Sequence, residues 1–333
     1  MKSSALILLL AATLLTAGVA PARGESRKGD TTRFSGKDYV QLGNWAHANE
    51  FAIRWLDHDK TLKLSNRQAR LVFSVDPRQD SRKAQINGTG VWLALPLVCQ
   101  YGAAYISQID LTETLAPILF PKANPPGYKI KTICLDPGHG GKDPGYQVGS
   151  NDEKKFTLLL AQEVRGQLKN SGFKVALTRT RDTYVERTAR AELAHKRGAD
   201  LFVSLHFNSA GPQHNEVTGL EVYCLTPAGA FSTNAGGEGD SQWCAGNRNN
   251  EKNILLAYQM QASLVRSLPV EDRGVHRARF EVLRESAMPS ILIEGGFMSN
   301  PAESRKIFDP AYRRQMARAI VDGILAYKRI VKG

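Results

Sequence analysis

The chain has 333 residues, of which 42% are hydrophobic and 23% are charged, so it can build a large globular domain plus a small one and is too apolar for a disordered protein. Lys and Arg number 44 against 32 Asp and Glu, and this net charge of +12 suits a protein that works on an anionic surface. No basic block or basic patch interleaved with aromatics stands out, so we expect no nucleic-acid partner.

Residues 1–22 have the pattern of a cleaved secretory signal peptide. Lys2 precedes an apolar run over residues 5–20, and the A-P-A triplet at residues 20–22 is a small-residue processing site. The run is too short to span a bilayer comfortably, and no second run of spanning length follows it. We therefore expect an exported protein of the periplasm, cell envelope or extracellular space, without stable membrane insertion after cleavage. An uncleaved membrane anchor is the alternative.

All four cysteines lie after this segment, at Cys99, Cys134, Cys224 and Cys244. An oxidising compartment permits disulfides, and Cys224 and Cys244 bracket a loop across which they could pair. Cys134 falls inside a predicted buried strand, where a free thiol is expected.

A polar linker over residues 23–36 leads into a small α+β domain that we place at residues 37–120. Short alternating runs separated by Asp-Pro and Asn-Gly turns predict strands, and residues 40–55 carry apolar side chains at helical spacing. The pattern resembles the N-terminal domain shared by some copper amine oxidases and many bacterial envelope proteins. It holds no His/Cys cluster for copper, so we interpret it as a targeting or assembly domain.

A proline-rich linker over residues 121–128 forms the domain boundary, and residues 129–330 follow as the domain that carries the chemistry. Apolar strand patterns alternate here with helical ones, and a last helix is predicted to begin at Asp309-Pro310. Such alternation predicts an α/β fold: a mostly parallel twisted sheet flanked by helices, preceded by the small α+β domain. The predicted strands cover residues 130–135, 173–178, 201–206, 220–225 and 291–294.

Three of these strands end in side chains that can bind a metal or move a proton. His139 follows the first strand in the turn D-P-G-H-G-G-K-D-P-G, His206 ends the third, and Glu294 ends the last. Parallel strands present their carboxyl ends at one edge, where ligands bind, so these groups are expected to converge. Glu153 stands at a predicted helix start, where a capping role is its ordinary alternative.

These segments resemble the zinc-dependent N-acetylmuramoyl-L-alanine amidases (type 3 amidases) that cleave bacterial peptidoglycan. The resemblance covers roughly residues 128–327, and beyond the histidine turn it includes A-D-L-F-V-S-L-H-F-N, G-L-E-V-Y, R-G-V and I-E-G-G-F-M-S-N-P. It implies that His139, Glu153 and His206 bind Zn²⁺ and that Glu294 is the catalytic residue. It also implies that the enzyme hydrolyses the amide between the lactyl group of N-acetylmuramic acid and the L-alanine of the stem peptide.

The implied ligand set suits zinc, because two imidazoles and one carboxylate leave an open position for water. The H-E-x-x-H helix motif of another zinc-hydrolase class is absent. Glu163 is a rival third ligand, although it lies well inside the predicted helix.

Other polar residues have weaker claims. Arginines 179, 181 and 187 could bind substrate carboxylates or be structural, and Asn208 could line the cleft. Histidines 195, 214 and 276 belong to no apparent constellation.

Some relatives carry an autoinhibitory helix that a partner protein removes. The corresponding residues 226–250 are rich in Gly, Ser and Asn, which favours a loop, so an activator protein is possible but not indicated. Two other functions stay open from the residues alone: a zinc peptidase or carboxypeptidase acting on the stem peptide, and a non-catalytic wall-binding envelope protein.

Overall fold

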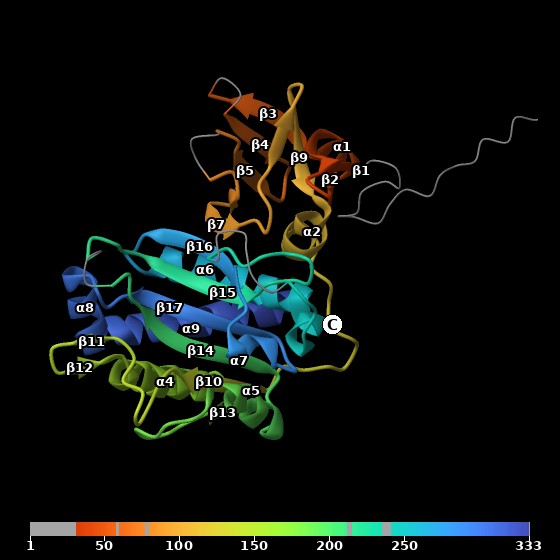
Figure 1. Cartoon of the computed structure of the whole chain (residues 1–333). Helices are drawn as coiled ribbons and strands as arrows, with labels where there is room; N and C mark the ends of the chain where they lie inside the picture. Colours follow the sequence, from red (N-terminus) through yellow and green to blue (C-terminus); the bar gives the residue numbers. More distant parts are fainter. Residues whose placement is uncertain (1–30, 58–59, 77–79, 212–214, 235–240, 333) are drawn as a thin grey trace, which may run out of the picture.

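A small β-rich domain sits above a larger domain in which a sheet is flanked by helices (Figure 1). The computed structural model describes residues 31–57, 60–76, 80–211, 215–234 and 241–332. The predicted signal peptide lies outside these described residues. Within them, no helix is both long enough and apolar enough to cross a bilayer.

Six strands form the sheet of the larger domain, in the order β13-β10-β14-β17-β15-β16. The first four run parallel, whereas β15 is antiparallel to β17 and parallel to β16. Helices cover both faces, which explains the nearly continuous apolar runs of these strands. The predicted α/β fold is confirmed, and β16 is the strand that the sequence analysis missed. The strands are β10 (Thr132–Pro137), β13 (Lys174–Leu177), β14 (Leu201–Asn208), β15 (Leu220–Leu225), β16 (Asp272–Ala278) and β17 (Ser290–Phe297).

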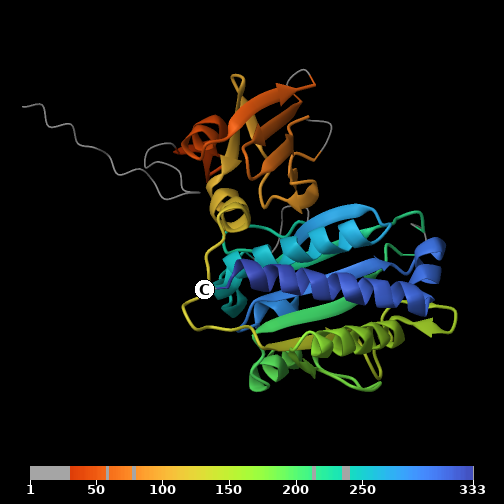
Figure 2. The same cartoon turned by 180° about the vertical axis from the view of Figure 1, so that it is seen from behind.

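Three long helices lie side by side across one face of this sheet: α4 (Glu153–Asn170), α6 (Asn250–Ser267) and α9 (Pro310–Ile330) (Figure 2). The last begins as predicted, because Asp309 accepts hydrogen bonds from the first turn and proline occupies its first position. The opposite face carries α5 (Arg187–Lys196) and α7 (Glu281–Arg284). Shorter elements complete the domain: β11 (Gln147–Val148), β12 (Asn151–Asp152), the 3₁₀ turn η2 (Ala245–Asn249) and α8 (Pro301–Phe308).

The N-terminal domain consists of a five-stranded antiparallel meander, β3 to β7, and a four-stranded sheet in the order β1-β2-β9-β8. Alternation of buried apolar and outward polar residues along the meander is the pattern of a sheet with one covered face. Its strands are β1 (Thr31–Phe34), β2 (Lys37–Gln41), β3 (Ala52–Leu56), β4 (Thr61–Ser65), β5 (Arg70–Ser74), β6 (Lys83–Ile86), β7 (Thr89–Trp92), β8 (Val98–Gln100) and β9 (Ala103–Ser107). Its helical segments are α1 (Leu42–Ala48), α2 (Gln108–Asp110), the π-helical turn η1 (Leu111–Leu115) and α3 (Ala116–Leu119).

The helix predicted over residues 40–55 is wrong in length. Helix α1 ends at Ala48, Glu50 takes a positive φ of 61°, and the chain then enters β3 at Ala52. A left-handed residue cannot continue a helix, so the apolar residues after Glu50 belong to a strand.

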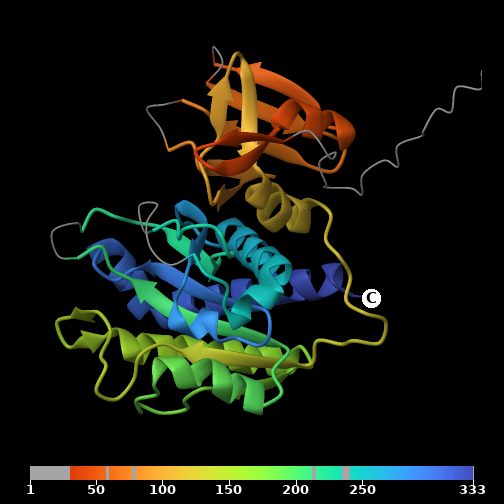
Figure 3. The same cartoon turned by 45° about the vertical axis from the view of Figure 1, so that its right-hand side comes forward.

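The two domains share one sheet, which the sequence analysis did not predict. Strand β7 pairs in parallel with β16 through Val91 and Val275, so the meander extends the larger sheet to eleven strands. The predicted linker, residues 121–128, runs down the side of the larger domain to β10 (Figure 3). It is held there by hydrogen bonds, one from Asn124 N to Val331 O at 2.9 Å and one from Lys122 Nζ to Glu251 Oε1 at 2.8 Å. The predicted boundary at residues 121–128 therefore lies where the two domains are fixed against each other.

Candidate metal centre

The turn after β10 presents His139 at the carboxyl edge of the sheet. His139 has a positive φ of 59°, an uncommon conformation for a non-glycine residue, so the surroundings must hold it. Two buried arginines do so. Arg179 donates to the carbonyls of Pro137 (3.0 Å) and Gly138 (2.7 Å), and Arg190 donates to those of Pro137 (3.0 Å) and His139 (2.9 Å).

Asp136, at the end of β10, balances this positive charge. Its carboxylate is fully buried and accepts hydrogen bonds from Arg190 (2.8 Å), Thr178 (2.6 Å) and Ser204 (2.7 Å). A buried charge is tolerated when it is paired and its remaining lone pairs are satisfied. The network therefore fixes the backbone from which His139 projects.

Glu153 is the first residue of α4, and its buried carboxylate contacts both histidines. Oε2 lies 3.0 Å from His139 Nε2, and Oε1 lies 3.1 Å from His206 Nδ1. Backbone N–H groups of Tyr146 and Phe207 donate to the two oxygens at 3.0 and 3.1 Å. The capping alternative for Glu153 is wrong, because the carboxylate points into the cluster of histidines instead.

His139, Glu153 and His206 form the one cluster with metal-ligand chemistry among the described residues. Each offers one donor atom, and these atoms lie within 4.8 Å of one another. Asp143 Oδ2 lies 2.9 Å from His139 Nδ1, the carboxylate–histidine arrangement that commonly orients a metal-binding imidazole.

Two glycines make this approach possible. A Cβ on Gly138 would lie 2.2 Å from His206 Cε1, and a Cβ on Gly145 would lie 2.5 Å from Glu153 Oε2. Gly138 thereby leaves room for the His206 ring.

The cluster shifts the acidity of its members. Burial raises the pKa of Glu153, but hydrogen bonds and charge from His139 and His206 outweigh burial and place the pKa well below its usual range. Burial lowers the pKa of His139, but Glu153 and Asp143 outweigh burial and raise it. Both shifts favour an ionised Glu153 carboxylate beside positively charged partners.

Glu294 lies beside this cluster. It is in register with His206 on β14 and with Glu221 on β15, so the three side chains form a row across adjacent strands. Its Oε2 is buried and has no hydrogen-bond partner within the described part of the chain. Burial, followed by the charges of Glu153 and Glu221, raises the pKa of Glu294 well above its ordinary value.

Glu221 was missed by the sequence analysis. Its buried carboxylate accepts one hydrogen bond from the Tyr223 hydroxyl and one from Arg273 Nε. The G-L-E-V-Y and R-G-V segments carried these three residues within the resemblance, but neither segment suggested a role for them. They fix a second carboxylate on the side of Glu294 away from the histidines.

A cleft of about 400 Å³ opens beside the histidines. His139 and His206 form one wall, and the region around α7 forms the other, including Phe280, Val282 and Glu281. Arg187 lines this cleft and pairs with Glu281 at 2.8 Å, so it can meet a ligand, whereas Arg179 is structural. Arg181 is exposed and does not line the cleft.

The remaining sequence candidates lie elsewhere. Glu163 lies along α4 near Arg313, outside the metal-ligand cluster. His195 is exposed, His214 lies outside the described residues, and His276 packs between Trp92 and Tyr223. Asn208 accepts a backbone hydrogen bond from Met298 and shapes the chain beyond β14.

The possible pairing of Cys224 with Cys244 does not occur, because both thiols are free. Cys224 is buried within β15, and Cys244 contacts Asn247 and Arg279. Cys134 is a buried free thiol, as predicted, and burial raises its pKa to about 12.

Known proteins share the larger domain. Residues 133–326 match the family model described as N-acetylmuramoyl-L-alanine amidase. The amidase AmiA of Escherichia coli (strain K12) is 34% identical over 248 residues, which cover 67% of this chain and 84% of the relative. The sporulation-specific amidase of Bacillus subtilis (strain 168) is 34% identical over 196 residues, or 58% of this chain and 66% of the relative.

Solved structures of N-acetylmuramoyl-L-alanine amidases also match this chain. An N-acetylmuramoyl-L-alanine amidase from Clostridium difficile 630 is 35% identical with a TM-score of 0.51, over 60% of this chain and 97% of that one. The amidase AmiC2 of Nostoc punctiforme is 33% identical with a TM-score of 0.51, over 61% and 99%. The N-terminal domain lies outside the family match, so its resemblance to the amine oxidase domain stays a prediction. The matched family covers more than half of the chain and contains the whole cluster described above; the chain therefore belongs to the N-acetylmuramoyl-L-alanine amidase family.

Proposed function

We propose that His139, Glu153 and His206 hold a zinc ion and that Glu294 is the general base and acid of this peptidoglycan amidase. As a member of its family, the enzyme hydrolyses the amide between N-acetylmuramic acid and the L-alanine of the stem peptide. The residue assignment rests on two observations: His139, Glu153 and His206 form a partly buried cluster, and Glu294 and Glu221 continue the row of His206 across the adjacent strands.

The donor set fits zinc. Two imidazole nitrogens and one carboxylate oxygen are a common protein ligand set for a catalytic zinc. The carboxylate already carries two backbone hydrogen bonds, and Arg190 holds the backbone carbonyl of His139, so both donors are held in place by partners outside the cluster.

When bound, zinc polarises the scissile carbonyl and makes a water molecule acidic enough to attack it near neutral pH. Glu294 takes the proton from the attacking water and returns it to the departing amine of L-alanine. Its raised pKa suits both steps, because a carboxyl that holds a proton more tightly than usual is a better base and still releases that proton to an amine. The partner-free Oε2 is the atom available for this exchange.

The peptidase alternative would use the same chemistry on another bond of the stem peptide. Family membership favours the amide next to muramic acid, and the paired presence of metal ligands and Glu294 disfavours a purely wall-binding protein. Between β15 and α6, the described residues form one helical element, the short η2, so no long helix of that part covers the cluster. This supports an enzyme without a built-in plug.

We also propose that the chain acts in the cell envelope after export, with peptidoglycan as its partner. The signal pattern over residues 1–22, the net charge of +12 and the envelope substrate of the family support this location.

Mass spectrometry of digested peptidoglycan tests the activity. The full chain should release intact stem peptides with a new amino-terminal L-alanine, and a chelator should abolish the release. Shortened stem peptides that remain attached to muramic acid would show that the enzyme is a peptidase and not an amidase.

Metal analysis separates the roles of the residues. Glu294→Gln should keep stoichiometric zinc and lose activity, whereas His206→Ala should lose both. Zinc retained in His206→Ala, or lost in Glu294→Gln, would overturn the assignment of ligands and base.

A further inference from the structure

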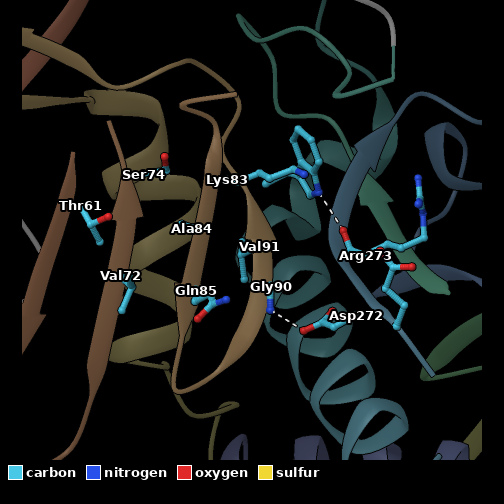
Figure 4. Close-up of a pocket in the computed structure, with 12 residues that line it drawn as sticks. Thr61, Val72, Ser74, Lys83, Ala84, Gln85, Gly90, Val91, Asp272 and Arg273 are labelled. Carbon is cyan, nitrogen blue, oxygen red and sulfur yellow. Dashed lines mark hydrogen bonds between the residues drawn. The ribbon is translucent and has the colours of Figure 1, made fainter. Parts of the chain in front are cut away.

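A groove separate from the metal cleft lies where the N-terminal domain meets β16. Its volume is about 370 Å³, and it lies between the outward face of the meander and the start of β16 (Figure 4). From the meander come Thr61, Val72, Ser74, Lys83, Gln85 and Trp92. From the larger domain come Glu271, Asp272 and Arg273. Both domains are needed to form it.

The groove has fixed walls. Asp272 Oδ2 accepts a hydrogen bond from Gly90 N at 2.8 Å, and the Trp92 indole donates to the Arg273 carbonyl at 2.8 Å. A Cβ on Gly90 would lie 3.1 Å from Gly274 Cα, so the two backbones are closely packed. A site built across this junction is therefore preorganised, which reduces the entropic cost of binding.

The groove opens at the same edge of the sheet as the catalytic row. Because β15 and β16 run against β17, their first residues lie at the edge where β10, β14 and β17 end. Arg273 links the two places directly, since its carbonyl accepts from Trp92 while its guanidinium donates to Glu221, the neighbour of Glu294.

The separation suits a polymer. Four strand spacings of about 4.8 Å separate β14 from β7, so the groove lies roughly 19 Å from His206 along the sheet edge. A small substrate could not reach both, whereas a polymer lying along this edge would occupy both.

The chemistry of the lining favours an uncharged sugar polymer. Of the charged residues in the lining, Arg273 pairs with Glu221 outside the groove, and Lys83 stands with the acidic Glu271 and Asp272, so the lining gives no preference for a polyanion. Hydroxyl and amide side chains of Thr61, Ser74 and Gln85 can both donate to and accept from sugar hydroxyls and N-acetyl groups. Val72 adds apolar surface for acetyl methyls, whereas the Trp92 ring packs against His276 and has the Lys83 ammonium 5.0 Å from its centroid.

We propose that this groove is a distal binding site for the glycan strand of peptidoglycan. The N-terminal domain then extends the substrate-binding edge of the enzyme and positions a chain whose cleavable amide lies at the metal cluster. The identity of the bound polymer rests on the proposed function, whereas the location of the groove does not. It replaces the idea of a separate targeting module with that of a shared substrate surface.

Kinetics on substrates of two lengths test the proposal. Lys83→Ala/Gln85→Ala removes two exposed side chains from β6 and leaves the buried face of that strand intact. The loss of two hydrogen-bonding side chains should raise KM about tenfold or more on long uncrosslinked glycan chains with stem peptides. The kcat on these chains, and kcat/KM on a single disaccharide-peptide, should stay unchanged. Arg70→Ala, which removes an exposed cation of β5 outside the groove, should match the wild type on both substrates.

An unchanged KM on long chains, or equal losses on both substrates, would overturn the proposal. Peptide-free glycan strands provide a readout that needs no hydrolysis, because the Glu294→Ala chain should bind them and the added groove substitutions should weaken that binding about tenfold. Equal binding with and without the groove substitutions would overturn the site. If a teichoic acid polymer competed for binding and glycan did not, the ligand of the groove would be a polyanion and not a sugar strand. A wild type that cleaves neither substrate would refute the amidase assignment, while the binding measurement would still decide on the groove.

Discussion

The two halves of the eleven-stranded sheet follow opposite rules. In the half from β13 to β16, charged side chains such as Asp136 and Glu221 are buried and fully paired. In the half from β7 to β3, the buried positions are apolar apart from Thr89, as at Leu64 and Phe73, and charged side chains point outward. Burying a charge costs free energy unless partners satisfy it, so the first half is organised around chemistry and the second around packing. One sheet therefore contains a reactive half and a supporting half.

The largest effect should come from unpairing a charge in the reactive half. Asp136→Ala leaves the buried Arg190 guanidinium without its carboxylate, and we expect a loss of about 3–5 kcal/mol in the free energy of unfolding. Urea denaturation followed by circular dichroism measures it. Lys63→Ala, at an outward position of β4, should change stability by less than about 0.5 kcal/mol. Similar losses in both variants would remove the contrast between the halves.

A substitution at the junction between the two halves should cause an intermediate loss of stability. Arg277 is fully buried and donates to the carbonyls of Leu225 and Glu113 and to the Thr114 hydroxyl, thereby joining β16 to η1. Arg277→Met leaves these acceptors unsatisfied, so we expect a loss of about 2–3 kcal/mol. Limited proteolysis should then cut within residues 121–128 faster than in the wild type. An unchanged cleavage rate would mean that the domains stay docked without this residue.

A third substitution tests how closely the reactive half is packed. In Gly138→Ala, the added methyl would lie 2.2 Å from the His206 ring and displace it. Zinc affinity should fall about 10–100-fold, as for other disturbances of ligand orientation. Gly43→Ala in α1 meets open space and should stabilise the protein by about 0.5–1 kcal/mol. Competition with a chromophoric chelator measures the affinity, and an unaltered value in Gly138→Ala would contradict the geometry.

The smallest expected effect is the pH dependence of stability that Glu294 causes. Because burial raises the pKa of Glu294, the metal-free folded state holds this proton more tightly than the unfolded state does. Stability from this group is present below the unfolded pKa of about 4.3 and is lost as pH rises toward the folded pKa. Glu294→Gln should therefore stabilise the metal-free protein by about 1 kcal/mol near pH 7 and by less at pH 4. Thermal unfolding with a chelator present measures this difference, and a gain that is larger at pH 4 would reverse the inferred direction of the shift.

The sequence predicted what lies at strand ends and missed what connects distant segments. His139, His206 and Glu294 could be placed at one sheet edge because apolar runs ended beside them, and Glu153 because a helix began there. Arg190 could not be found in this way, since a polar residue within a short helix looks solvent-exposed until β10 is placed beneath it.

The pairing of β7 with β16 was hidden for a related reason. Hydrophobic periodicity indicates that a strand exists, but the partner of that strand depends on tertiary contacts. Here the contact is formed by Val91 and Val275, in separate domains, and nothing in either local pattern points to the other.

The close approach of Gly90 and Gly274 has an evolutionary consequence. Gly274 belongs to the R-G-V segment of the hydrolase domain, whereas Gly90 belongs to a module that lies outside the family match. A side chain at either position would press on the backbone of the other strand, and at Gly274 it would also be strained by the positive φ of 93°, so this junction favours glycine at both positions. Glycine at both positions should therefore distinguish homologues whose modules are fused in this manner from those in which a similar module is merely tethered.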